Sequence, residues 1–247
     1  KKRSMYKDKS TLLDSLELKI ISHACAITKC NEKKLIFDPW LSGKVFNNGW
    51  ELKNEIDIKT ISEQKINYVY ISHEHPDHFH VPTLKALNES WNPTFLIQKT
   101  HDRRVATFIS KVLGKEVIEL ADGKELRLSK QMSIRIYSHG HMDSFALVKL
   151  GRCNILNIND CVLKSKESLD QLRSRLPAGI KIDILMSQYS FASYQGNRNE
   201  GRQIYKASAQ HLEWIKQREN FFKPLMFIPF ASGINWCSTE NSYLNEY

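Results

Sequence analysis

A chain of 247 residues, 41% of them hydrophobic and 26% charged, is long enough for one large α/β domain and short for two. The mean hydropathy of −0.44 and the lack of a long apolar run predict no membrane span. Lysines and arginines give a net charge of +9 but are spread along the chain without an arginine-rich run. This pattern favours a small anionic substrate over a nucleic-acid partner.

The five cysteines are odd in number and form no CxxC pair, so we expect no disulfide framework and a cytoplasmic location. The N-terminus is basic and lacks the apolar core of a signal peptide. We therefore expect a single domain over residues 1–247, with residues 1–15 as a flexible basic segment. The chain does not begin with methionine and can be part of a longer protein. No oligomeric state follows from the sequence.

Apolar and polar residues alternate at the start of the chain, which predicts strands over residues 16–20, 26–28 and 35–37. Residues 42–62 are predicted to form a loop that overhangs the site. Within this loop, Trp50 either contacts substrate or pins the loop to the body of the protein.

The central part of the chain alternates predicted strands with predicted helices. Residues 68–71, 95–97 and 116–120 are expected as strands, and Pro82 suits the first turn of a helix. Residues 102–113 predict a helix that ends at Gly114, with Val105, Phe108, Ile109 and Val112 as its apolar stripe.

The second half continues in the same way. We expect strands over residues 134–137, 145–150, 154–158, 182–186 and 225–230, and a long helix over residues 203–222 with Leu212 turned inward. The mixture indicates an α/β protein without internal repeats.

A cluster of metal-binding residue types directly follows the predicted strand over residues 68–71. In extended backbone, residues two apart point to the same side, so His73 and His75 can reach one ion. A turn at the following proline can bring Asp77 and His78 toward a second position. Imidazoles with a carboxylate suit zinc, iron or manganese. Four of the nine histidines fall within residues 73–80, which argues against a chance cluster.

This His-x-His-x-Asp-His pattern resembles the signature of the metallo-β-lactamase superfamily, and the resemblance extends from about Leu16 onward. Residues 37–41, 138–143 and 157–161 are similar to further motifs of that family. The resemblance implies a four-layer αββα sandwich, in which two sheets pack together and helices cover both outer faces. Its metal ligands then lie on loops at one edge.

The resemblance also implies two metal positions. The first would be bound by His73, His75 and His139. The second would be bound by Asp77 and His78, with Asp160 bridging the two. The family adds a last histidine after the final strand, but residues 228–233 contain none. Either the second metal binds weakly, or water, substrate or a further histidine fills the gap.

Several neighbouring residues have two interpretations each. His139 and His141 compete for one ligand position, with spacing in favour of His139, and His141 is also a candidate for filling the gap. Asp38 either accepts the free N–H of a ligand imidazole or is a plain turn aspartate. His23 either contacts substrate or orients a ligand, or else packs. His80 either caps the following helix or touches the site.

A closer resemblance is to the catalytic domain of CMP-N-acetylneuraminate hydroxylases and to the lactonase and phospholipase D-like branch. It rests on residues 70–73, 82–85, 155–161 and 229–231. Those hydroxylases carry a Rieske iron–sulfur domain, which needs two Cys and two His in paired motifs. This sequence contains no such pairing. Cys161 follows Asp160 directly and is expected to face the opposite side, in the core.

The leading hypothesis is a metal-dependent hydrolase that uses one or two divalent ions, zinc first and iron or manganese as alternatives. A metal-activated water would attack an anionic ester, lactone or phosphodiester, and Asp77 would hold the water and pass on its proton. The alternatives are an iron-dependent oxygenase acting on a nucleotide sugar with a separate electron donor, a non-enzymatic binding protein, and a nuclease.

Overall fold

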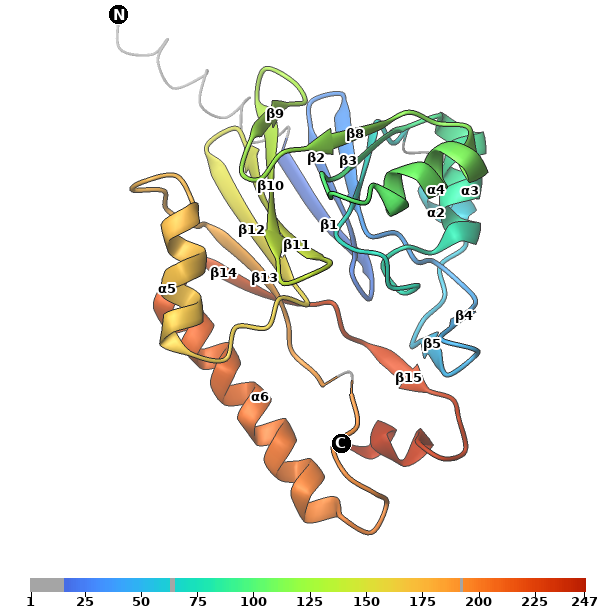
Figure 1. Cartoon of the computed structure of the whole chain (residues 1–247), viewed down its shortest axis with the longest axis vertical. Helices are drawn as coiled ribbons and strands as arrows, with labels where there is room; N and C mark the ends of the chain where they lie inside the picture. The colour runs from blue at the N-terminus through green and yellow to red at the C-terminus, as the bar shows by residue number, and fades with distance from the viewer. Residues whose placement is uncertain (1–15, 63–64, 192) are drawn as a thin grey trace, which may run out of the picture.

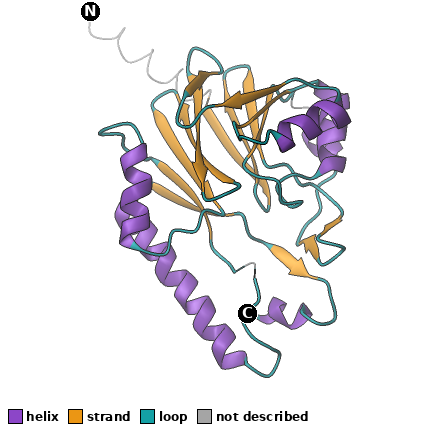
Figure 2. Cartoon of the chain, in the orientation of Figure 1, coloured by secondary structure: helices purple, strands orange, loops and turns teal. Residues whose placement is uncertain are grey.

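Two six-stranded sheets dominate the computed structural model, which describes residues 16–62, 65–191 and 193–247 (Figures 1 and 2). The first sheet has the order β1-β2-β3-β6-β7-β8. It is antiparallel from β1 to β3 and parallel from β3 to β8. Its strands are β1 (Leu16–Ser22), β2 (Cys25–Cys30), β3 (Lys33–Phe37), β6 (Tyr68–Ile71), β7 (Thr94–Gln98) and β8 (Val117–Leu120).

The second sheet has the order β14-β13-β12-β11-β10-β9. Its β9–β12 part is antiparallel, whereas β12, β13 and β14 run parallel. Its strands are β9 (Glu125–Arg127), β10 (Met132–His139), β11 (Asp143–Leu150), β12 (Cys153–Asn159), β13 (Ile184–Gln188) and β14 (Met226–Phe230). A separate three-stranded sheet joins β4 (Lys44–Val45), β5 (Trp50–Leu52) and β15 (Ile234–Trp236).

Helices cover the outer face of each large sheet (Figure 2). The first sheet is covered by α2 (Ile58–Ser62), α3 (Val81–Trp91) and α4 (Arg104–Leu113), and the second by α5 (Lys166–Arg175) and α6 (Gly201–Phe222). A short 3₁₀ helix, η1 (Ser242–Glu246), lies near the C-terminus. The layers are helix, sheet, sheet, helix, which confirms the predicted αββα sandwich.

Strand alternation divides the apolar residues between the layers. In β6, Val69 faces the helices α2–α4, whereas Tyr70 faces the second sheet. In β12, Ile155 faces the first sheet and Leu156 faces α5. The Tyr70 hydroxyl lies 2.9 Å from Oγ of Ser144, so a hydrogen bond also joins the two sheets. The sheets are thereby held together beside the edge at which β3, β6 and β12 end.

Two sequence predictions on local structure are wrong. The predicted loop over residues 42–62 contains β4, β5 and α2, and β5 is held by pairing with β15, which lies far along the chain. The predicted apolar stripes are also only partly buried: Phe108 in α4 and Leu212 in α6 are 41% and 56% exposed. No described helix, α6 included, is long and apolar enough to cross a membrane.

Candidate metal centre

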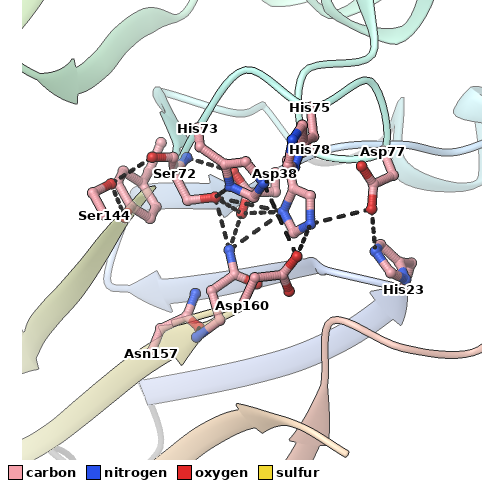
Figure 3. Close-up of polar contacts among 12 residues, drawn as sticks. His23, Asp38, Ser72, His73, His75, Asp77, His78, Ser144, Asn157 and Asp160 are labelled. Atoms are coloured by element: carbon pink, nitrogen blue, oxygen red, sulfur yellow. Dashed lines mark hydrogen bonds and ion pairs between the residues drawn. The ribbon is translucent and has the colours of Figure 1, made fainter. Parts of the chain in front are cut away.

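All the predicted metal ligands except His139 meet at the sandwich edge where β3 and β6 of the first sheet and β12 of the second sheet end (Figure 3). The histidine motif follows β6, Asp38 follows β3, and Asp160 follows β12. The backbone leaves the extended conformation at these points, with φ of 33° at Asp38 and 46° at Asn159. Such positive φ values are uncommon outside glycine but are tolerated by Asp and Asn. These strand ends place short polar side chains beneath the motif.

Asp38 is the centre of a buried hydrogen-bond network. Its Oδ1 accepts from the backbone N–H of Ser72 at 2.7 Å, and its Oδ2 accepts from Oγ of Ser72 at 2.7 Å. The same Oδ2 accepts from Nδ2 of Asn159 at 2.5 Å and lies 3.1 Å from Nδ1 of His78. Asp38 therefore lies beneath the site, against a predicted ligand imidazole, in the geometry that its sequence position suggested.

The same network sets the orientation of His73. The Ser72 hydroxyl donates to Asp38, so it accepts from Nδ1–H of His73, whose nitrogen lies 2.9 Å away. A proton on Nδ1 leaves Nε2 of His73 free to bind a metal. Sequence reasoning missed Ser72 and Asn159 as functional residues, although each directly precedes a predicted ligand.

One cluster of potential ligands consists of His73, His78 and Asp160, with one atom from each within 4.8 Å of the others. Oδ2 of Asp160 lies 3.2 Å from Nε2 of His78 and 4.0 Å from Nε2 of His73. His75 joins this cluster from the solvent side, since its Nδ1 lies 2.9 Å from Nε2 of His73. Two imidazoles and a carboxylate thus converge on one point, with a third imidazole beside them.

A second cluster shares His78 and adds Asp77 and His23. Oδ2 of Asp77 lies 3.1 Å from Nε2 of His23 and 3.3 Å from Nε2 of His78. Figure 3 shows the Asp77 carboxylate between the two rings. All three side chains are buried.

Several buried ligand atoms of the two clusters lack a hydrogen-bond partner in the metal-free protein. Nε2 of His78 and Oδ1 of both Asp77 and Asp160 are buried without a hydrogen-bond partner. Nδ1 of His78 faces Asp38, so a neutral His78 carries its proton there and turns the lone pair of Nε2 toward two carboxylates. Buried polar groups are normally paired, and a cation between these atoms would pair all of them. The residues present therefore fit one or two divalent ions.

Electrostatics within the clusters shift the pKa values in opposite directions. Burial and the neighbouring His78 lower the pKa of His73 to about 3, so His73 is neutral and ready to coordinate. Burial opposes a charge on His78 as well, but Asp77 and Asp160 outweigh it and raise its pKa well above the usual value. In the metal-free protein, a proton on His78 therefore offsets the negative charge of Asp77 and Asp160.

The two candidates for the third motif lie apart from these clusters. Neither cluster found in residues 16–62, 65–191 and 193–247 includes His139. His139 ends β10, is paired across the strands with Asp143, and hydrogen-bonds to the Val162 backbone. His141 is exposed and, with His73, lines a cavity of about 320 Å³. The assignment of His139 as a ligand stays a prediction.

The remaining alternatives are resolved by packing. His80 is the N-cap of α3, where its Nδ1 accepts from the Thr83 backbone N–H. Trp50 is 8% exposed and packs beside Trp40, so it pins the segment to the body. Cys161 is buried in the core beneath α5, as predicted.

The surroundings of the centre include two features that the sequence did not indicate. Phe46 is 39% exposed, and its ring centroid lies 6.1 Å from that of His75 and 4.6 Å from that of Trp50. Arg104, at the rim of the cavity beside His73, pairs with Glu74 at 2.7 Å. An aromatic surface and a cationic side chain thus flank the metal ligands.

Comparisons with known proteins agree with this fold. The β-lactamase superfamily domain matches residues 17–170. A cytidine monophosphate-N-acetylneuraminic acid hydroxylase from Danio rerio is 25% identical over 94% of this chain and 40% of its own length, so the chain spans about two fifths of that relative.

Two solved structures share the architecture. CmlA, a diiron β-hydroxylase from Streptomyces venezuelae, aligns with a TM-score of 0.64 and 15% identity over 89% of this chain and 45% of its own. Igni18, a metallo hydrolase from Ignicoccus hospitalis KIN4/I, aligns with a TM-score of 0.59 and 15% identity over 88% of this chain and 82% of its own. The chain belongs to the β-lactamase superfamily domain family and adopts the metallo-β-lactamase fold, with a site suited to divalent metal.

Proposed function

We propose that the chain is an iron-dependent oxygenase domain that hydroxylates an anionic, nucleotide-sugar-like substrate. The observation that carries this proposal is the cluster of His73, His78 and Asp160. Two histidines and one carboxylate on one face, with open positions, are typical of non-haem Fe(II) oxygenases. The three-histidine zinc site that the resemblance implied would need His139, which lies outside the cluster.

Sequence similarity supports the same reaction class. The relatives that match 94% of this chain are named as hydroxylases of cytidine monophosphate-N-acetylneuraminic acid. Because the chain spans only about two fifths of their length, their activity and substrate are carried over here as part of the proposal.

The reaction would convert R–H, O₂, two electrons and two protons into R–OH and water. Bound iron would supply the redox chemistry that activates dioxygen. The two electrons would come from a reduced iron–sulfur centre outside these 247 residues, since their five cysteines lack the paired Cys and His motifs of a Rieske cluster.

The residues of the chain contribute orientation and binding. Ser72 and Asp38 hold the imidazoles of His73 and His78 with Nε2 toward the ion. The exposed ring of Phe46 would pack against the planar part of the substrate. Arg104 at the cavity rim would bind the anionic group by exchanging its ion pairs with Glu74 and Asp102.

Metal-dependent hydrolysis is the second candidate, and Asp77 favours it. Asp77 belongs to the second cluster, and its Oδ1 is buried without a hydrogen-bond partner. A carboxylate in this place can accept the proton of an attacking water and pass it to a leaving group. Zinc is the metal expected for this reaction on an ester, lactone or phosphodiester.

An isotope experiment separates the two reactions. The iron-loaded protein is incubated with CMP-N-acetylneuraminate and a chemical reductant under ¹⁸O-labelled oxygen gas in ordinary water. A parallel sample contains ordinary oxygen gas and ¹⁸O-labelled water. We expect heavy oxygen in the product only from the gas. If the product takes up ¹⁸O only from water, and zinc supports the reaction as well as iron does, the reaction is hydrolysis and the hydroxylation proposal is wrong.

A further inference from the structure

His23 lies against the segment after β14, in which the last histidine of the superfamily pattern is missing. The segment after β14 is tied to it through the backbone, since Ala231 N–H donates to the His23 carbonyl at 3.0 Å. The next residue, Ser232, directs its carbonyl oxygen at Nδ1 of His23, 3.2 Å away. The resemblance to the superfamily predicts a metal-binding histidine in this segment. The chain instead uses the segment to hold a histidine that follows β1.

Hydrogen bonding determines which nitrogen of His23 is free. A carbonyl oxygen can only accept, so Nδ1 of a neutral His23 carries the proton and donates it to Ser232. Nε2 then has a lone pair, which points at Oδ2 of Asp77 from 3.1 Å. A lone pair and a carboxylate oxygen repel each other at this distance unless a proton or a metal ion lies between them. At this distance, Nε2 of His23 and Oδ2 of Asp77 can both bind one metal ion.

Packing holds the ring in this orientation. His23 is 8% exposed, and its ring meets Trp40 edge-on with centroids 5.7 Å apart and His78 edge-on at 5.3 Å. A metal-bound histidine usually donates its other ring N–H to a carbonyl or carboxylate, as Nδ1 of His23 does to Ser232.

We infer that His23 is a ligand of a second metal ion, which it would bind with Asp77, beside the ion held by His73, His78 and Asp160. This inference rests on the proposed metal centre and adds a second ion to it. The competing arrangement is a His23 imidazolium that forms a simple ion pair with Asp77, in which case metal content does not depend on His23.

The test is the number of ions bound per chain. Wild-type protein, His23→Ala and His23→Asn are loaded with Fe(II) without oxygen, desalted, and measured by elemental mass spectrometry. The asparagine variant keeps a donor near the Nδ1 position for the Ser232 carbonyl but lacks Nε2. His211→Ala is the matched control, since His211 lies in α6 against Phe191 and Trp214. Circular dichroism and thermal unfolding verify that each variant is folded.

We expect two ions in the wild-type protein and the control, and one in each His23 variant. Two ions in a folded His23→Asn protein would overturn the assignment of His23 and leave the proposed function intact. A single ion in the wild-type protein would likewise overturn it, because no second ion would exist. No ion in the wild-type protein after loading would overturn both the inference and the proposed function.

Discussion

Oδ2 of Asp38 lies 3.1 Å from Nδ1 of His78, and both side chains are completely inaccessible to solvent. The contact links a residue after β3 to the last ligand of the histidine motif, 40 positions away. It fixes the proton of His78 on Nδ1 and leaves the lone pair of Nε2 free to bind a metal ion. The metal centre therefore depends on a residue that contacts no metal itself.

Asp38→Asn is expected to weaken metal binding. The amide would present a donor to at least one of the groups that now donate to Asp38, so the His78 ring would lose its fixed orientation. Loss of such a partner typically costs about 10–100-fold in metal affinity. Competition with a chromophoric chelator measures the change. The control is Asp170→Asn, an exposed carboxylate paired only with Lys166 on α5. Equal metal affinities of the wild-type protein and Asp38→Asn would show that Asp38 does not support metal binding.

Asp77→Ala is expected to abolish turnover while one ion stays bound. His73, His78 and Asp160 remain in place for that ion, because their contacts with Ser72 and Asp38 do not involve Asp77. Turnover and metal content are measured on the same sample. A variant that keeps its turnover would contradict the assignment of Asp77 to the reaction.

Metal affinity is expected to rise with pH. The pKa of His78 is raised above its usual value by Asp77 and Asp160 despite its burial, so an incoming ion must displace a proton from it. Affinity therefore increases by up to about tenfold per pH unit below that pKa and levels off above it. His73, with its pKa lowered to about 3, is already neutral and adds no dependence near neutrality. Chelator competition between about pH 6 and about pH 8 tests this, and a flat profile would contradict it.

Phe46 and Trp50 are expected to differ in their effects although their rings are in contact. Phe46→Ala should raise KM with little loss of stability, because the Phe46 side chain is exposed beside His75. Trp50→Ala should lower the free energy of unfolding by about 3–5 kcal/mol, because it removes a buried side chain. Steady-state kinetics and chemical denaturation measure the two effects. An unchanged KM for Phe46→Ala would exclude Phe46 from substrate binding.

Much of the fold and part of the site were predictable because their signals are local. The apolar run before His73 ends at the metal motif within a few residues, and Gly114 ends α4 in the left-handed conformation typical of a helix C-terminus. The class of fold followed from the resemblance that these local motifs carry.

The remainder depends on pairs that are distant in sequence. His23 meets Asp77 across 54 positions and Ser232 across 209, and no periodicity in one segment indicates such contacts. The small sheet that positions Phe46 joins β5 to β15 in the same way. His139 was chosen by spacing alone, whereas its side chain direction depends on how the β10–β11 hairpin packs.

The most direct test of the account is anomalous diffraction at the iron and zinc edges, from crystals of protein purified without an affinity tag or chelator. We expect one iron peak between His73, His78 and Asp160 and a second between His23 and Asp77. A single zinc peak bound by His73, His75 and His139 would contradict both the oxygenase proposal and the role of His23.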